Sequence, residues 1–153
     1  MREVVCRIAV AVISLLFTAP GIVAQGPISQ TLAQTKTIYV VPMRGGMDHY
    51  LTNELVQWGR FQITVNPQQA DALLSETPKV NIGAIMTDPQ KVQKASSTKG
   101  TLFLIDPKSL QVLWSVYKKP NEPFILGGDK SNPELAREMI SALRKDLGTQ
   151  NQK

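Results

Sequence analysis

An arginine and two glycines stand directly before an amphipathic run, and this combination of residue types is suited to holding an anion. Arg44 supplies a guanidinium group, and Gly45 and Gly46 would let the free N–H groups at a helix start approach a ligand. His49, the single histidine of the chain, follows shortly after. One hypothesis is therefore a small-anion or nucleotide-derived ligand site at these four residues. The competing interpretation, which we favour, is a tight strand-to-helix turn that needs glycine.

The spacings typical of catalytic and metal centres are absent from the sequence. HExxH, GxSxG, the phosphate-loop pattern GxxxxGK[ST] and the dinucleotide pattern GxGxxG do not occur. The only cysteine, Cys6, lies near the amino terminus. A hydrolase is the weakest of the hypotheses that we consider. It would need acidic residues such as Asp48, Asp71 and Asp106 to converge in one pocket. We predict a non-catalytic protein without a metal ion or cofactor.

A long polar segment at residues 77–100 offers a second candidate binding surface. It contains four lysines, two prolines and a pair of serines, and we expect it to be a long loop. Connections of this length are commonly either mobile or functional. We therefore expect Lys91, Lys94 and Lys99 to contact a partner.

The stretch before this segment predicts a strand and a helix that position the glycine loop. Residues 37–41 are β-branched and aromatic and are stopped by proline, which is typical of a strand buried on both faces. From Met47 to Trp58 apolar residues recur at helical spacing. Asp48 can cap the amino end of this helix, and Gly59 can end it in a left-handed conformation.

Four further runs predict strands. Residues 61–65 alternate apolar and polar side chains, with one better-buried face, and residues 70–74 favour a turn entering a strand. Residues 102–105 and 112–116, separated by a turn that contains Asp-Pro-Lys-Ser, predict a hairpin. We interpret Trp114 and Tyr117 as core residues of this hairpin and not as a stacking platform.

The last helix has the clearest sequence signals. Asn132 fits the position of the amino-terminal cap, Pro133 the first helical position and Gly148 the end. One apolar stripe must face the sheet: Leu135, Met139, Leu143 and Leu147. The sequence therefore predicts an α+β fold with a mixed sheet of about 4–5 strands in β-α-β-β-β-α order and two helices packed on one face.

The first residues have the layout of a bacterial secretory signal. Arg2 and Arg7 precede an almost continuous apolar run at residues 8–17, which is too short to span a bilayer and is followed by Pro20. We expect cleavage after Ala24. The mature protein is then expected to be periplasmic or secreted, with no transmembrane span and no thiol.

The expected domain organisation follows from these boundaries. Residues 1–24 form the signal peptide, 25–36 a flexible leader, 37–148 a single domain, and 149–153 a disordered tail. Cleavage would leave 15 basic and 11 acidic residues and therefore a net charge of +4. This balance favours an envelope protein or an anionic envelope polymer as partner. Nucleic acid is not expected, because no basic patch is interleaved with aromatic residues.

Three features carry a resemblance to a known group of proteins: the proline-ended first strand, the strand that is followed by Ala70-Asp71-Ala72-Leu73, and the hairpin. Together they resemble the small periplasmic α+β domains of the bacterial envelope, which include the amino-terminal domain of TolB, the curli-secretion lipoprotein CsgG and activators of penicillin-binding proteins. The resemblance covers most of residues 37–147 and implies an assembly factor and not an enzyme. An exported family of similar shape outside this group is the alternative.

The leading functional hypothesis is an exported, non-catalytic binding or assembly module of the bacterial cell envelope. Its binding surface would be an exposed sheet edge or the lysine-bearing segment. Lipid anchoring is not implied, because the expected cleavage point has no cysteine. The alternative is a small anionic-ligand-binding domain that uses the glycine loop.

Overall fold

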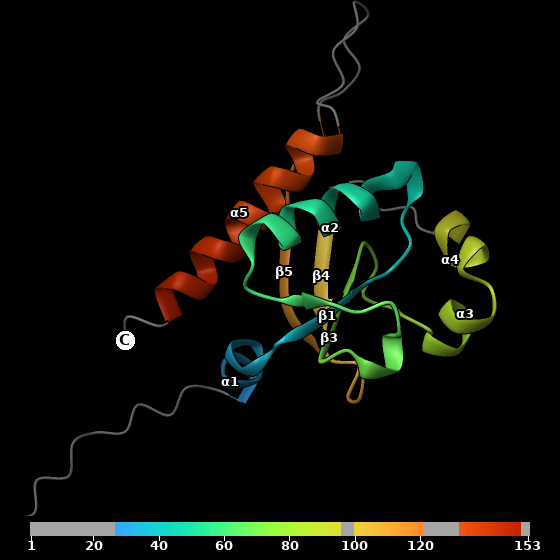
Figure 1. Ribbon diagram of the computed structural model, residues 1–153, viewed down its shortest axis with the longest axis horizontal. Coiled ribbons are helices and arrows are strands. Elements are labelled where there is room, and N and C mark those ends of the chain that lie inside the picture. The colour runs from blue at the N-terminus through green and yellow to red at the C-terminus, as the bar shows by residue number, and fades with distance from the viewer. Residues whose placement is uncertain (1–26, 96–99, 121–131, 151–153) are drawn as a thin grey trace, which may run out of the picture.

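One mixed sheet of five strands forms the centre of the molecule (Figure 1). The computed structural model describes residues 27–95, 100–120 and 132–150. The strands lie in the order β2-β1-β3-β4-β5, with β1 parallel to both β2 and β3 and the other neighbours antiparallel. Their bounds are β1 Thr37–Val40, β2 Gln62–Ile63, β3 Ala72–Ser75, β4 Thr101–Ile105 and β5 Val112–Tyr117.

Two main helices pack together on one face of this sheet, as predicted. They are α2 (Met47–Trp58) and α5 (Asn132–Gln150), which run side by side in Figure 1. Every second strand residue points toward them, because side chains alternate across a strand. The apolar stripe expected for α5 is buried in this layer, together with Leu51 and Leu55 of α2. The α+β class and the mixed sheet are thus confirmed.

The opposite face of the sheet carries a second, smaller core under two short helices. These are α3 (Ile82–Thr87) and α4 (Pro89–Ala95), which lie within the segment that we expected to be a loop. Asn81 Oδ1 accepts a hydrogen bond from the Ala84 N–H at 3.0 Å, and Asp88 Oδ1 accepts one from the Lys91 N–H at 3.0 Å. The prediction of one long loop was wrong because these two capped turns are stabilised by burial.

The expected flexible leader is also partly helical. α1 (Pro27–Gln34) packs against β5 and α5, and its Leu32 is only 2% exposed. The prediction missed this helix because its eight residues, with Ile28 and Leu32 four positions apart, are too few to establish an apolar period. Residues 1–26, which contain the predicted signal peptide and cleavage point, lie outside the described residues. Among the described helices, none is long and apolar enough to cross a membrane.

Three local expectations need correction. Val65 does not continue a half-buried strand: it is 94% exposed, and Thr64 Oγ1 accepts a hydrogen bond from the Asn66 N–H at 3.1 Å, which turns the chain into a 3₁₀ turn. Asp48 does not cap α2, because Gly46 occupies the cap position without a side-chain bond. The last helix continues through Gly148 to residue 150, so residues 149 and 150 are helical and do not form the expected disordered tail. Gly59, by contrast, ends α2 in the predicted left-handed conformation.

The predicted hairpin is present, with a register irregularity between Leu104 and Ile105. Trp114 is half-buried and packs against the larger core, and its Nε1–H donates to Asp146 Oδ2 at 2.8 Å. Tyr117, which we expected in the core, is 63% exposed. It lies near the end of β5 on the face opposite α2 and α5, where no described helix covers it.

Candidate functional site

The glycine turn after β1 is tied into the fold. The 3₁₀ turn η1 (Arg44–Gly46) has Gly45 at φ 66° and Gly46 at φ 71°, so both glycines hold left-handed conformations. Asn132 Nδ2 donates to the Gly45 carbonyl at 2.7 Å and so joins this turn to the start of α5. The geometry agrees with the structural-turn interpretation, although the anion hypothesis remains a prediction.

The other members of this candidate site lie on the surface of the same turn. Arg44 is exposed, and the His49 side chain is 86% exposed, with Nε2 3.9 Å from Asp48 Oδ2. The second oxygen of that carboxylate, Asp48 Oδ1, is buried and finds no hydrogen-bond donor among the described residues. Burial raises the pKa of Tyr39, and the Asp48 carboxylate raises it further. These residues therefore share one end of the sheet.

The three acidic residues of the hydrolase hypothesis do not converge. Asp48 follows the carboxyl end of β1, whereas Asp71 Oδ2 accepts bonds from the Lys36 and Thr37 N–H groups at its amino end, at 3.0 and 2.9 Å. Asp106 closes the hairpin turn through the Lys108 N–H and the Ser109 hydroxyl. Asp106 thus stabilises its own turn, whereas Asp71 joins the segment before β3 to the start of β1.

The structure brings the lysine-bearing segment close to the glycine turn. Gln93 Nε2 of α4 donates to the Met43 carbonyl at 2.9 Å, and Met43 directly precedes Arg44. Lys91 is exposed on α4 and therefore lies at the same end of the sheet. The side chain of Lys94, also on α4, and all of Lys99 lie outside the described residues. The glycine turn and the lysine-bearing segment, which the sequence analysis considered as separate candidate surfaces, are therefore adjacent in the structure.

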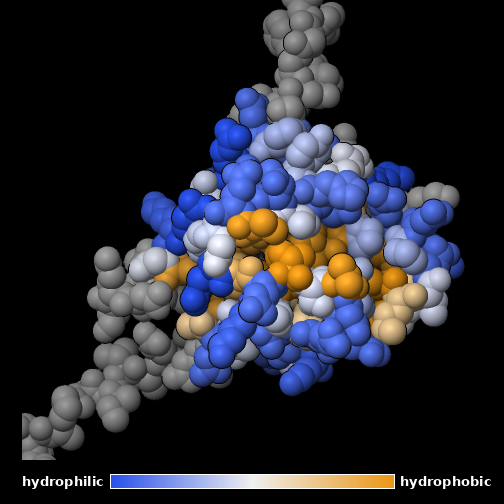
Figure 2. Space-filling model, viewed as in Figure 1, coloured by the Kyte–Doolittle hydropathy of each residue, from blue (hydrophilic) through white to orange (hydrophobic). Residues whose placement is uncertain are grey.

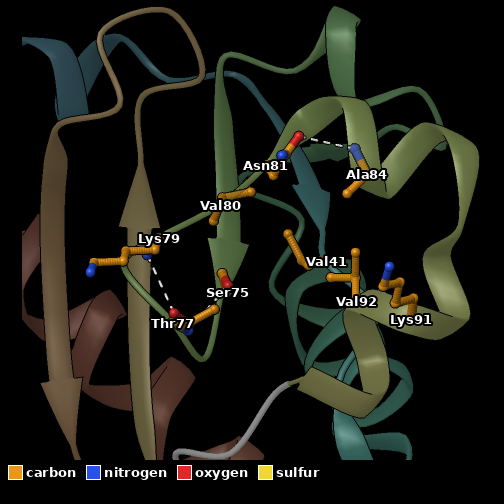
Figure 3. A pocket seen from close by; sticks show the side chains of 9 residues that line it. All are labelled: Val41, Ser75, Thr77, Lys79, Val80, Asn81, Ala84, Lys91 and Val92. Atoms are coloured by element: carbon orange, nitrogen blue, oxygen red, sulfur yellow. Dashed lines mark hydrogen bonds between the residues drawn. The ribbon is translucent and has the colours of Figure 1, made fainter.

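A small hollow lies between β1, β3 and the helices α3 and α4 (Figure 3). Its volume is about 290 Å³. Nine side chains line it: Val41, Ser75, Thr77, Lys79, Val80, Asn81, Ala84, Lys91 and Val92. In Figure 3 the Lys79 side chain points away from the other eight, whereas Lys91 stands on the α3–α4 side. Sequence reasoning missed this hollow, since it depends on where the two short helices pack.

The two edge strands of the described sheet, β2 and β5, differ in how well they could bind a partner. β2 has two residues, and Figure 2 shows apolar side chains gathered on the surface of the molecule in the region where Figure 1 draws the sheet below α2. β5 is longer, with six residues. A two-residue strand offers few backbone groups to a partner, so β5 is the stronger candidate.

The middle of β5 presents backbone groups away from the sheet. The Lys118 N–H donates to the Gly100 carbonyl at 2.7 Å, so Lys118 faces β4. In an antiparallel ladder the facing residues alternate, which turns Val116 toward β4 and Ser115 and Tyr117 away from it. Within the described chain β5 is the last strand, and the outward N–H and C=O groups of these two residues have no partner.

Comparison with models of protein families, with curated proteins and with solved structures gives no match. The α+β fold class is therefore established by the structure alone, and the resemblance to envelope-assembly domains stays a prediction.

Proposed function

We propose that this protein is an exported, non-catalytic binding or assembly module of the bacterial cell envelope, which captures its partner through the β5 edge of its sheet. The observation that carries the proposal is the backbone of Ser115 and Tyr117, which faces outward from a six-residue strand at the edge of the described sheet and has no hydrogen-bond partner among the described residues. Exposed edges of this kind are templates for an added strand, and main-chain hydrogen bonds supply the affinity in such complexes.

As far as the described residues show, strand pairing at this edge is restricted at both ends of β5 and is possible between them. The register irregularity disturbs the start of β5, and Pro120 follows its end, where it cannot donate a hydrogen bond. Such features limit pairing with unrelated strands. An extended partner segment would therefore pair with the few residues from Ser115 onward.

The side chains beside this edge suit an extended peptide. Tyr117 is exposed, and half-buried Phe103 lies on the same face of the neighbouring strand, opposite Ser115 in the register. Aromatic side chains offer a large contact area when they are desolvated. The proposed partner is thus a protein with an extended segment, consistent with the envelope setting expected from the sequence.

A proline substitution tests this edge with little disturbance of the fold. Ser115→Pro removes the outward N–H, and Trp114 before it is already extended, as a residue before proline prefers. Ser115→Ala is the matched control because it keeps the N–H. We expect affinity capture from solubilised envelope to recover a reproducible protein with wild type and with Ser115→Ala, and about tenfold less of it with Ser115→Pro, from the lost hydrogen bond and the ring clash.

Thermal melts of both variants establish that they fold. Equal capture by Ser115→Pro and Ser115→Ala would show that the partner does not add a strand at β5. The anionic-ligand alternative predicts instead that Arg44→Ala abolishes ligand-induced thermal stabilisation.

A further inference from the structure

The hollow beside α3 and α4 lies where the chain leaves two parallel strands toward opposite faces. After β1 the chain enters η1 and α2 on the larger core, and after β3 it enters α3 and α4 on the smaller core. A crevice at the carboxyl ends of the strands results from such a divergence, and ligands of open sheets commonly bind there. The position of the hollow is thus a consequence of the topology.

The walls of the hollow are fixed by contacts at three points. Asn81 caps α3, Asp88 caps α4, and Gln93 ties α4 to the carbonyl of Met43. Val41 is buried in the sheet beneath, and Val80 and Val92 are partly buried in the same cluster. These bonds and the smaller core hold α3 and α4 against the sheet beside the hollow.

The lining is apolar at the centre, and its polar groups are largely occupied. The Ser75 hydroxyl accepts a hydrogen bond from the Thr77 N–H at 3.2 Å, and Asn81 Oδ1 accepts from Ala84. Lys91 adds a cation at the mouth, and within the described residues it forms no ion pair. The nearby carboxylate of Asp88 is engaged in capping α4 through Oδ1.

We propose that this hollow binds a short aliphatic carboxylate, with the chain among Val41, Val80 and Val92 and the carboxylate at Lys91. The volume of about 290 Å³ is close to the lower limit of ligand pockets and gives room for roughly ten non-hydrogen atoms. A short chain of this size would replace water against apolar side chains, which favours binding. This inference is independent of the proposed β5 edge.

The test is a titration of the full chain with butanoate, hexanoate and octanoate, followed by the NMR signals of the valine methyl groups. We expect saturable shifts at Val41, Val80 and Val92. The affinity should rise about fourfold for each added CH₂ group. Hexanamide, which lacks the charge, should bind several-fold more weakly than hexanoate, since charged hydrogen bonds are stronger.

Three variants locate the site. Lys91→Gln should weaken hexanoate binding about threefold to tenfold. Lys79→Gln is the matched control, because Lys79 also lines the hollow but points away from it in Figure 3, and it should leave binding unchanged. Ala84→Leu should fill the hollow and abolish the shifts.

Ser115→Pro should bind hexanoate like wild type, which separates this site from the β5 edge. The absence of saturable shifts at the three valines at millimolar carboxylate would overturn the proposal. Equal binding of hexanoate and hexanamide, unaffected by Lys91→Gln, would overturn it as well.

Discussion

Gly45 has two roles at the turn between β1 and α2: it holds a left-handed conformation, and its carbonyl accepts the Asn132 hydrogen bond. A Cβ atom at Gly45 would lie 3.1 Å from Asn132 Nδ2, whereas one at Gly59, which has a similar φ of 70°, would meet nothing within 4 Å. Gly59→Ala therefore isolates the conformational cost, about 1 kcal/mol. We expect Gly45→Ala to lower the free energy of unfolding by about 2 kcal/mol, because it also disturbs the hydrogen bond.

Urea unfolding of the two variants measures this difference. Equal losses of stability would mean that the Asn132 contact contributes nothing to the fold.

Asp71 gives a pH-dependent contribution to stability. The Thr37 N–H hydrogen bond lowers the pKa of Asp71, burial opposes this, and the Lys36 N–H and the nearby Lys108 charge add to the lowering. Because the folded pKa lies below the unfolded value of about 3.9, the stabilisation is complete well above that pH and is lost as pH falls through the folded pKa. We expect the stability difference between wild type and Asp71→Asn to shrink below about pH 4.

Unfolding titrations of both proteins between about pH 2 and pH 6 check this expectation. A difference that is constant across the range would show that the carboxylate does not favour the folded state.

At the scale of single residues, the sequence predicted backbone conformations better than it predicted which residues contact one another within the fold. The left-handed conformation of Gly59 at the end of α2 was predictable, since few residues other than glycine adopt it readily. The bond between Asn132 and Gly45 could not be predicted, because 87 positions separate the two residues. The exposure of Tyr117 was missed for the same reason, as it depends on what packs over the hairpin.

Among the elements, α5 depends most directly on its buried stripe. Leu143 is fully buried between α5 and the sheet, so Leu143→Asp would place a charge in the larger core. We expect this variant to lose its cooperative thermal transition. Ser141→Asp, at an exposed position of the same helix, is the control and should melt like wild type.

A cooperative melt of Leu143→Asp close to that of wild type would show that the stripe is not buried.

Elements with a long apolar period were predictable, and short ones were not. α2, α5 and the hairpin repeat their pattern over many residues, which fixes both type and face. α3 and α4 have six and seven residues, too few for a period to emerge. The sequence signals for these helices were their capping residues, Asn81 and Asp88. The side chain of each accepts a hydrogen bond from the backbone N–H three positions later. A search for caps would have found both helices.

At the scale of the whole molecule, the fold class was predictable, but the surfaces that a partner could use were not. The order of the strands decides which of them lie at the edges of the sheet, and this order depends on pairing between strands that are distant in the sequence. The same packing brought Lys91 close to the glycine turn and created the hollow. The sequence predicted neither, because each depends on contacts between distant segments.

The most direct test of the proposed β5 edge is amide hydrogen exchange of the full chain, free and in complex with a protein recovered by the affinity capture. In the free protein, Ser115 and Tyr117 should exchange fast, whereas Val116, which is bonded to β4, should be protected. Partner binding should slow Ser115 and Tyr117 and leave Val116 nearly unchanged. Protection that appears elsewhere, at α4 or at the glycine turn, while these two amides stay fast would contradict the account.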